Sequence, residues 1–216
     1  MINLESVNKY FDEGAVVAVN SVSLKIESEE KLALKGPSGA GKSTLLNLIG
    51  TIDSPTSGEI HVNGENLSNI ERKNRFRAKT IGFIFQFHHL LPNLTSLENV
   101  ELPLFTEKTT RRERRDRAME LLESVGIENK YNKLPGQLSG GERQRIAVAR
   151  ALVNNPSIIL ADEPTGNLDE KTGKRVIDLL VNYCHTNQAT LILATHNDTI
   201  AECMDRSIFM EYGSIN

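Results

Sequence analysis

The stretch that decides the fold of this chain is Gly36-Pro37-Ser38-Gly39-Ala40-Gly41-Lys42-Ser43. It fits the phosphate-binding pattern G-x-x-x-x-G-K-[ST] at every fixed position. The glycines let the backbone curl, so that successive N–H groups point at phosphate oxygens. Lys42 supplies a cation for the β- and γ-phosphates, and the hydroxyl of Ser43 is placed to ligate Mg²⁺. This loop predicts a site for a nucleoside triphosphate and Mg²⁺.

The residues on either side of the loop agree with that prediction. Residues 31–35 have the composition of a short strand that runs into the loop. The segment 44–49, which begins with Thr44 at the edge of the same site, is typical of an amphipathic helix, and Gly50 ends it. Such a helix points the positive end of its dipole at the phosphates. A chance glycine loop would not be expected between a strand and a helix in this order.

Length and composition limit the class of protein. The 216 residues are enough for one well-filled domain, and 39% hydrophobic with 25% charged residues is typical of a soluble globular protein. No run approaches the roughly 20 apolar residues of a membrane-spanning helix, and the first residues do not resemble a signal peptide. Cys184 and Cys203 match no metal-binding spacing, so we expect free thiols in a cytosolic protein. A net charge of −3 argues against nucleic acid as an obligatory partner.

Strands and helices alternate along most of the chain, which predicts an α/β fold with a largely parallel core. Apolar strands are predicted at 81–85, 158–161 and 190–195, and helices at 111–125, from Ser139 to before Pro156, and at 172–184. The first third has the composition of strands and turns, including 16–19, 22–26 and 58–62. We predict one domain over residues 1–216, with a core of about 1–86 and 146–216 and an inserted helical subdomain of about 87–145.

A second candidate anion site is Leu138-Ser139-Gly140-Gly141-Glu142. Ser139 is a good helix N-cap, and Gly140 and Gly141 leave backbone N–H groups accessible at the start of the helix. Because the first glycine loop already covers one side of the triphosphate, we expect Ser139 and Gly141 to contact the γ-phosphate of a nucleotide held by a second copy. That arrangement is a head-to-tail dimer with two nucleotides in its interface. The alternative is an ordinary capped helix.

Three further polar residues follow buried strands, at the sheet edge where α/β proteins bind their ligands. Asp162 ends the strand 158–161 and suits a carboxylate that holds Mg²⁺ through water. Glu163 comes next and is the candidate general base for the attacking water. His196 ends the following strand and could donate to the γ-phosphate or polarise the water, although a lone histidine is more often structural.

Six motifs occur in the order found in the ATPases of ABC transporters, and the resemblance extends from Leu4 to Gly213. They are the glycine loop, Gln86, Leu-Ser-Gly-Gly-Glu, Ile-Ile-Leu-Ala-Asp-Glu, Asn167-Leu168-Asp169 and Ala194-Thr195-His196. The resemblance implies a RecA-like core with an N-terminal antiparallel β subdomain, ATP hydrolysis and separate membrane subunits. It also implies that Gln86 contacts Mg²⁺ and couples to the membrane partner, that Asp169 lines the dimer interface, and that Phe11 stacks on adenine. Tyrosine is commoner at that last position, and the adjacent Tyr10 is an alternative.

The segment Phe83-Ile84-Phe85-Gln86-Phe87-His88-His89-Leu90-Leu91-Pro92 is similar to the lipoprotein-releasing branch of that family. ATPases of macrolide export and of cell division share most of the other motifs. The resemblance implies a protein bound peripherally to the cytoplasmic face of the inner membrane. Four apolar residues just after Gln86 could form a groove for a helix of the membrane partner, or could be core: Phe87, Leu90, Leu91 and Leu94.

Two other classes of protein share parts of this pattern. Soluble ABC-type ATPases of DNA repair or translation usually carry a second cassette, a coiled-coil insertion or zinc cysteines, which this sequence lacks. A P-loop GTPase would need Asn-Lys-x-Asp, and the Asn-Lys pairs at Asn8 and Asn132 lack the aspartate. The basic run 111–117 is interleaved with acidic residues, so we expect a solvated helix start rather than a nucleic-acid or lipid contact.

Overall fold

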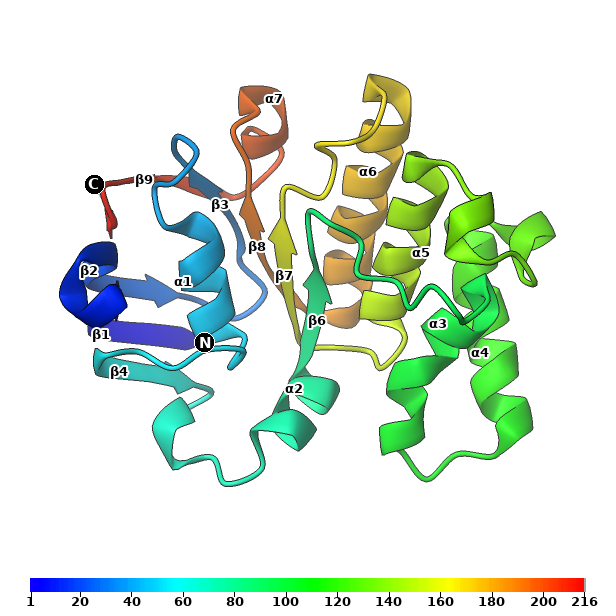
Figure 1. Ribbon diagram of the computed structural model, residues 1–216, viewed down its shortest axis with the longest axis horizontal. Coiled ribbons are helices and arrows are strands. Elements are labelled where there is room, and N and C mark those ends of the chain that lie inside the picture. The colour runs from blue at the N-terminus through cyan, green and yellow to red at the C-terminus, as the bar shows by residue number, and fades with distance from the viewer. Residues whose placement is uncertain (216) are drawn as a thin grey trace.

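A computed structural model describes residues 1–215, which form two β-sheets and a set of helices (Figure 1). The smaller sheet is antiparallel and has the strand order β2-β1-β4-β5. Its strands are β1 (Ile2–Phe11), β2 (Val16–Ile26), β4 (Ser57–Val62) and β5 (Glu65–Asn66). Asn63 and Gly64 both have positive φ, 52° and 84°, as a tight hairpin turn between β4 and β5 requires.

The larger sheet has the order β10-β9-β3-β8-β7-β6. Its strands β3 (Lys31–Lys35), β6 (Ile81–Ile84), β7 (Ile158–Asp162), β8 (Thr190–Ala194) and β9 (Arg206–Glu211) are parallel, and β10 (Ser214–Ile215) is antiparallel to β9. With the antiparallel N-terminal sheet and the inserted helices, this topology confirms the predicted α/β fold.

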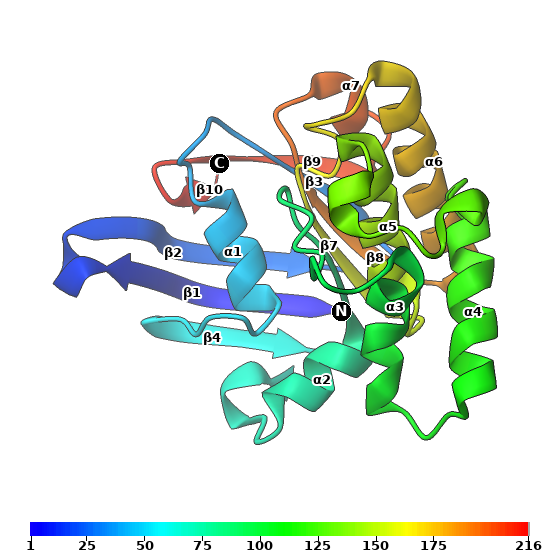
Figure 2. The same cartoon turned by 45° about the vertical axis from the view of Figure 1, so that its right-hand side comes forward.

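The helices lie on both faces of the larger sheet. They are α1 (Lys42–Ile49), α2 (Lys73–Thr80), α3 (Ser96–Glu101), α4 (Arg111–Ser124), α5 (Gly140–Leu152), α6 (Glu170–Asn187) and α7 (Asp198–Ala201). Short 3₁₀ turns occur at Asp12–Gly14, Leu67–Asn69, Leu102–Thr106 (η3), Glu128–Lys130 and Pro135–Gln137. Helix α1 contacts both sheets, whereas α3, α4 and α5 pack on one another at the other side of the molecule (Figure 2).

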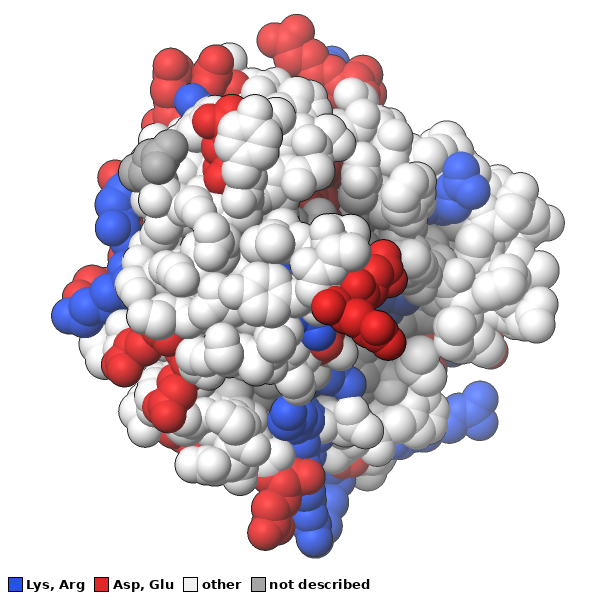
Figure 3. All heavy atoms as spheres, turned by 60° about the vertical axis from the view of Figure 1, so that its left-hand side comes forward, with Lys and Arg blue, Asp and Glu red and all other residues white. Residues whose placement is uncertain are grey.

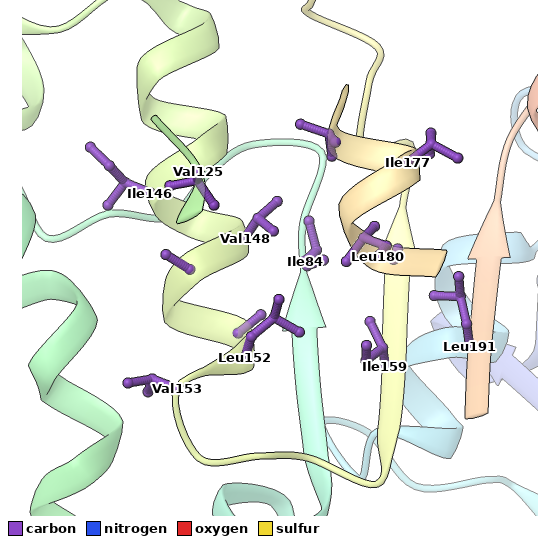
Figure 4. Close-up of a cluster of buried hydrophobic side chains, with 14 of the residues drawn as sticks. Ile84, Val125, Ile146, Val148, Leu152, Val153, Ile159, Ile177, Leu180 and Leu191 are labelled. Atoms are coloured by element: carbon purple, nitrogen blue, oxygen red, sulfur yellow. The ribbon is translucent and has the colours of Figure 1, made fainter. Parts of the chain in front are cut away.

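The central strands divide their side chains between two hydrophobic cores. On β7, Ile159 and Ala161 join the core under α5 and α6, whereas Ile158 and Leu160 join the core around α1. Figure 4 shows the first of these cores between α5, α6 and the sheet. Because side chains alternate along a strand, a register slip of one residue would exchange the two sets. Burial on both faces explains why these strands read as continuous apolar runs.

Some elements differ from the sequence-based predictions. Strand β2 is one strand over Val16–Ile26 rather than two, and α6 extends from Glu170 to Asn187 beyond both predicted ends. Helix α5 is continuous through residue 145, where we placed the end of the helical subdomain, and that domain division stays a prediction. Within residues 1–215, no helix has the length and apolarity that a bilayer crossing requires.

Candidate nucleotide-binding site

The glycine loop between β3 and α1 is built where the backbone has no room for side chains. Gly36 has φ +146°, and a Cβ there would lie 2.0 Å from the carbonyl oxygen of Met210. Gly41 has φ +103°, and a Cβ there would lie 2.1 Å from the carbonyl oxygen of Ala18. Both contacts are far shorter than any real Cβ makes, so the two fixed glycines of the motif are steric requirements of this fold.

Lys42 opens helix α1 and is only 8% exposed. Its ammonium donates hydrogen bonds to the carbonyl oxygens of Gly36 and Pro37, at 2.7 and 2.8 Å. These carbonyls hold the cation within the loop, next to the backbone N–H groups that start the helix. The cation and the helix N-terminus therefore make one electropositive site.

A cleft of about 580 Å³ lies beside this loop. Its lining includes the predicted site residues Ser38, Gly39, Ala40, Gly41, Lys42, Ser43, Thr44, Gln86, Asp162, Glu163 and His196, together with Val16, Val17, Ala18 and Gly166. The polar members come from the carboxyl ends of β6, β7 and β8 and from the start of α1. The parallel sheet therefore gathers residues that lie far apart in the sequence at one edge.

Asp162 lies at the end of β7, facing the start of α1. Burial raises the pKa of its carboxyl group, and the negative charge of Glu163 raises this pKa further. The hydroxyl of Ser43, as a hydrogen-bond partner, and the charge of Lys42 oppose that rise. The charged form of this buried carboxyl group is destabilised unless a cation binds close to it.

Glu163 and His196 form a pair at the mouth of the cleft. The Nδ1 atom of His196 lies 2.8 Å from Oε1 of Glu163, and the Glu163 side chain is 13% exposed while the His196 side chain is 74% exposed. The backbone of Glu163 has φ +46°, and its N–H donates to the carbonyl of Ala194 at 3.0 Å. A non-glycine residue in this left-handed region is strained by about 1–3 kcal/mol, and such strain concentrates at functional sites. Sequence patterns carry no signal for that conformation.

Gln86 follows β6 and also lines the cleft. Strand β7 lies between β6 and β8, the strand that leads to His196. Asn167 donates to the carbonyl oxygen of Gln86 at 3.3 Å. The guanidinium of Arg150, near the end of α5, donates to the carbonyls of His88 and His89 at 2.7 and 2.6 Å. Arg150 thus fastens the segment after Gln86 to helix α5, a link that our sequence analysis did not find.

Apart from Gly36 and Pro37, whose carbonyls accept hydrogen bonds from Lys42, five predicted site residues lie outside the residues that line this cleft. Ser139 caps α5, and its hydroxyl accepts from the N–H of Glu142 at 3.3 Å while Glu142 accepts from the N–H of Ser139 at 2.9 Å. A Cβ at Gly140 would meet nothing within 4 Å, so the space beside the helix start is open. Gly141 follows in the first turn of the same helix. Asp169 caps α6 by accepting from the N–H of Thr172 at 3.0 Å.

Phe11 is the fifth of these residues. Its ring is exposed at the end of β1, and the ammonium of Lys9 lies 5.0 Å from its centroid. The hydroxyl of the adjacent Tyr10 donates to Asn8 at 3.1 Å. Val16 and Val17, on the paired strand, line the cleft instead.

The apolar segment after Gln86 is divided between core and surface. Leu90 packs against the core, Leu94 is half-buried, and Phe87 and Leu91 are exposed. A separate groove of about 320 Å³ runs along the same segment and is lined by Phe83, Phe85, His89, Pro103, Arg150 and residues of α2. Of the two alternatives for these four residues, core holds for Leu90, and none of the four lines this groove.

Similarities to known proteins agree with this geometry. Residues 19–166 match the model of the family described as ABC transporter. The lipoprotein-releasing system ATP-binding protein LolD of Psychrobacter arcticus is 44% identical, and the match covers 99% of this chain and 96% of that protein. LolD of Bacteroides fragilis is 43% identical over 100% of both chains.

Solved structures give the same result. The ATP-binding cassette MJ0796, determined as a dimer in a post-hydrolysis state bound to ADP and Pi, superposes with a TM-score of 0.96. It is 41% identical, and the match covers 100% of this chain and 97% of that one. With the glycine loop, the sheet-edge carboxylates and the cleft that they line, these similarities place the chain in the ABC transporter family as an ATP-binding and ATP-hydrolysing subunit.

Proposed function

We propose that this chain powers the release of lipoproteins from the inner membrane, as a peripheral ATPase bound to membrane subunits on the cytoplasmic face. The observation that carries the hydrolytic part is the cleft in which Lys42, Glu163 and His196 converge. The observation that favours lipoproteins is full-length identity of 43–44% to proteins named for lipoprotein release. ATPases of macrolide export or of cell division are the alternative, and soluble ABC ATPases are a more distant one.

The residues at the sheet edge fit Mg²⁺. Mg²⁺ binds through few protein oxygens together with phosphate oxygens and water. Ser43, Asp162 and Gln86 offer a hydroxyl, a carboxylate and an amide oxygen along one cleft. Burial and the charge of Glu163 raise the pKa of Asp162, and a divalent cation bound beside this carboxyl group would favour its charged form. When bound, the metal would neutralise charge that develops on the phosphates.

Glu163 is the proposed general base for the attacking water. Its carboxylate lies at the cleft, and its strained backbone fixes where the side chain starts. His196 would orient that carboxylate through the 2.8 Å contact and offer its other ring nitrogen to the γ-phosphate. Phosphate contacts would come from the loop N–H groups, Lys42 and Thr44, with Gly36 to Gly41 providing close approach.

A second copy is proposed to complete each site, in a head-to-tail dimer. Ser139, Gly140 and Gly141 form a capped helix start that does not line the cleft of its own chain. Open space beside Gly140 supports an approach of phosphate from outside. Asp169 would lie at the same interface, and Phe11 or Tyr10 would stack on adenine. The dimeric state of the similar cassette MJ0796 supports this assembly.

The membrane subunits are proposed to dock beside the segment after Gln86. Phe87 and Leu91 are exposed there, and the groove of about 320 Å³ adjoins them through His89. Arg150 ties the carbonyls of His88 and His89 to α5. A helix docked on this segment would therefore be linked both to Gln86, which precedes it, and to α5. Such a link is what a coupling between nucleotide state and membrane partner requires.

Depletion of the protein in its native cell tests the physiological role. We expect outer-membrane lipoproteins to accumulate in the inner membrane, measured by membrane fractionation, while drug efflux and cell division continue. Re-expression of the wild-type protein should restore the distribution, and Glu163→Gln should not. Normal lipoprotein distribution with failed efflux or division would overturn the proposal in favour of a sibling system.

A further inference from the structure

Helix α2 has an unusual charge pattern that the nucleotide site does not explain. Residues 72–80, which comprise its N-cap and the helix, contain no acidic residue and five basic ones, namely Arg72, Lys73, Arg75, Arg77 and Lys79. Like charges at spacings of three and four along a helix repel and destabilise it. The helix nevertheless forms in this protein, where hydrogen bonds from Lys73, Arg77 and Asn154 hold it to its surroundings.

Two of these cations have structural partners. The ammonium of Lys73 donates to the hydroxyl of Ser54 at 3.2 Å. The guanidinium of Arg77 donates to the carbonyl of Thr51 at 2.9 Å. These bonds fasten α2 to the loop that follows α1, which leaves the remaining cations to be explained.

Arg72, Arg75 and Lys79 face outward. All three side chains are exposed, and within residues 1–215 none of them forms an ion pair or donates a side-chain hydrogen bond. Their spacing of three and four places them on one face of the helix. Figure 1 places α2 at the lower end of the molecule, where Figure 3 shows Lys and Arg atoms interleaved with Asp and Glu atoms.

An apolar surface adjoins this basic face. Asn154 donates to the carbonyl of Ala78 in α2 at 2.8 Å and to that of Pro103 in η3 at 3.1 Å, so the two elements are held together. On η3, Leu102 is exposed and the Phe105 ring is 63% exposed. The guanidinium of Arg114 lies 4.4 Å from the Phe105 centroid, which adds a further cation beside the ring.

We propose that the α2–η3 surface, made of Arg72, Arg75, Lys79, Leu102 and Phe105, binds the headgroups of an anionic phospholipid membrane. Unpaired cations beside exposed apolar side chains suit a lipid interface, where the charges meet anionic headgroups and the ring enters the acyl boundary. An acidic protein segment is the other occupant of matching charge, but the exposed phenyl ring favours lipid. The inference goes beyond the proposed function, because it requires neither cargo nor membrane subunits.

Vesicle co-sedimentation of the purified full-length protein tests this inference. Vesicles of phosphatidylglycerol and phosphatidylcholine in equal parts should bind the protein at low salt, and vesicles of phosphatidylcholine alone should not. Each cation near an anionic surface contributes about fivefold, so Arg72→Gln/Arg75→Gln/Lys79→Gln should lower binding roughly 100-fold. Phe105→Ser should lower it roughly tenfold.

The matched control removes the same charge from the first turns of α6. Lys171→Gln/Lys174→Gln/Arg175→Gln changes three exposed cations at the end of the molecule away from α2 (Figure 1). The control should retain vesicle binding within about twofold, because exposed charges act only within about a Debye length. Basal ATPase of the α2 variant should be unchanged. Equal binding of the wild-type protein to both kinds of vesicle, or equal loss in the control, would overturn the inference and favour a protein partner.

Discussion

Oε1 of Glu163 lies 2.8 Å from Nδ1 of His196, and this contact joins the ends of the neighbouring strands β7 and β8. Glu163 is mostly buried and His196 is mostly exposed, so the imidazole covers the carboxylate from the solvent side. A carboxylate held in this way has a fixed direction toward the cleft. The pair is therefore the natural place to begin testing the proposed chemistry.

Glu163→Gln should leave ATP binding nearly intact and lower turnover by about 10²–10⁴-fold, because the amide keeps the size of the side chain but cannot accept the proton. ATP should then trap a dimer, visible as a doubled mass in size-exclusion chromatography with light scattering. His196→Ala serves as a partner variant and should lower turnover less. Hydrolysis by Glu163→Gln above about a tenth of the wild-type rate would remove this residue from the role of base.

Lys42→Ala should weaken ATP binding itself. The ammonium that now bonds to the carbonyls of Gly36 and Pro37 is the cation available to the phosphates, and a charge-assisted hydrogen bond contributes about 1.5–3 kcal/mol, or roughly 10–100-fold in affinity. Calorimetric titration with ATP measures the change. Unchanged affinity would contradict the assignment of the loop.

Ser139→Arg should abolish hydrolysis yet leave ATP binding to the monomer intact, because Ser139 does not line the cleft of its own chain. Ser139→Ala controls for the lost helix cap, worth about 1 kcal/mol. Mixing Ser139→Arg with Lys42→Ala places both lesions on one site of a head-to-tail heterodimer, so some ATPase should return if one intact site suffices. Loss of ATP binding by the Ser139→Arg monomer would be incompatible with a contact made across the dimer.

Leu91→Glu should spare the ATPase activity of the free protein and detach it from membranes. The Leu91 side chain is exposed, while its backbone N–H donates to the buried Asn99 at 2.8 Å, so the loop should keep its shape. In contact with a partner helix, an unpaired carboxylate would be buried at high cost. Leu91→Ala, which only shortens the side chain, is the matched control. Membrane fractionation measures the outcome, and full retention of Leu91→Glu would place the docking surface elsewhere.

Asp162→Asn should stabilise the nucleotide-free protein at neutral pH. Burial raises the pKa of this carboxyl group in the folded state, so its contribution to stability is full below the unfolded pKa and is lost as pH rises through the folded pKa. At a pH above both the folded and the unfolded pKa, the charged carboxylate lowers the free energy of unfolding, and the neutral amide removes that loss. In a chain of this size each 1 kcal/mol shifts the unfolding midpoint by about 2–4 °C. The advantage of the variant should vanish below the ordinary pKa of 3.8, and a lower midpoint at neutral pH would argue against the raised pKa.

The parts of the fold that the sequence analysis found are those with local signals. The glycine loop, the doubly buried strands β7 and β8 and the capped start of α5 each follow from a few adjacent residues. Strand β1 gave no such signal. Its pairing with β2 shifts register between Leu4 and Val7, which breaks the alternation that sequence reading depends on.

The candidate site was predictable wherever a motif ends a strand, as at Asp162 and His196. The left-handed backbone of Glu163 and the bonds from Arg150 to the carbonyls of His88 and His89 depend on tertiary packing, so no short pattern reports them. The position of Phe11 is similar, since Lys9 and the paired strand decide where its ring lies. The charge of α2 was visible in the sequence and was overlooked beside the longer basic run at 111–117.

Helix α5 has a mechanical consequence for the proposed dimer. Its 13 residues span about 20 Å, with the Ser139 cap at one end and Arg150 near the other, and its inward face is buried. A helix packed in this way moves as a stiff lever and does not bend. Engagement of Ser139 by the nucleotide of one copy would therefore displace the carbonyls after Gln86 in the other copy. The two ATP sites would then be mechanically coupled through this helix, so that a change at one site would be transmitted to the other copy.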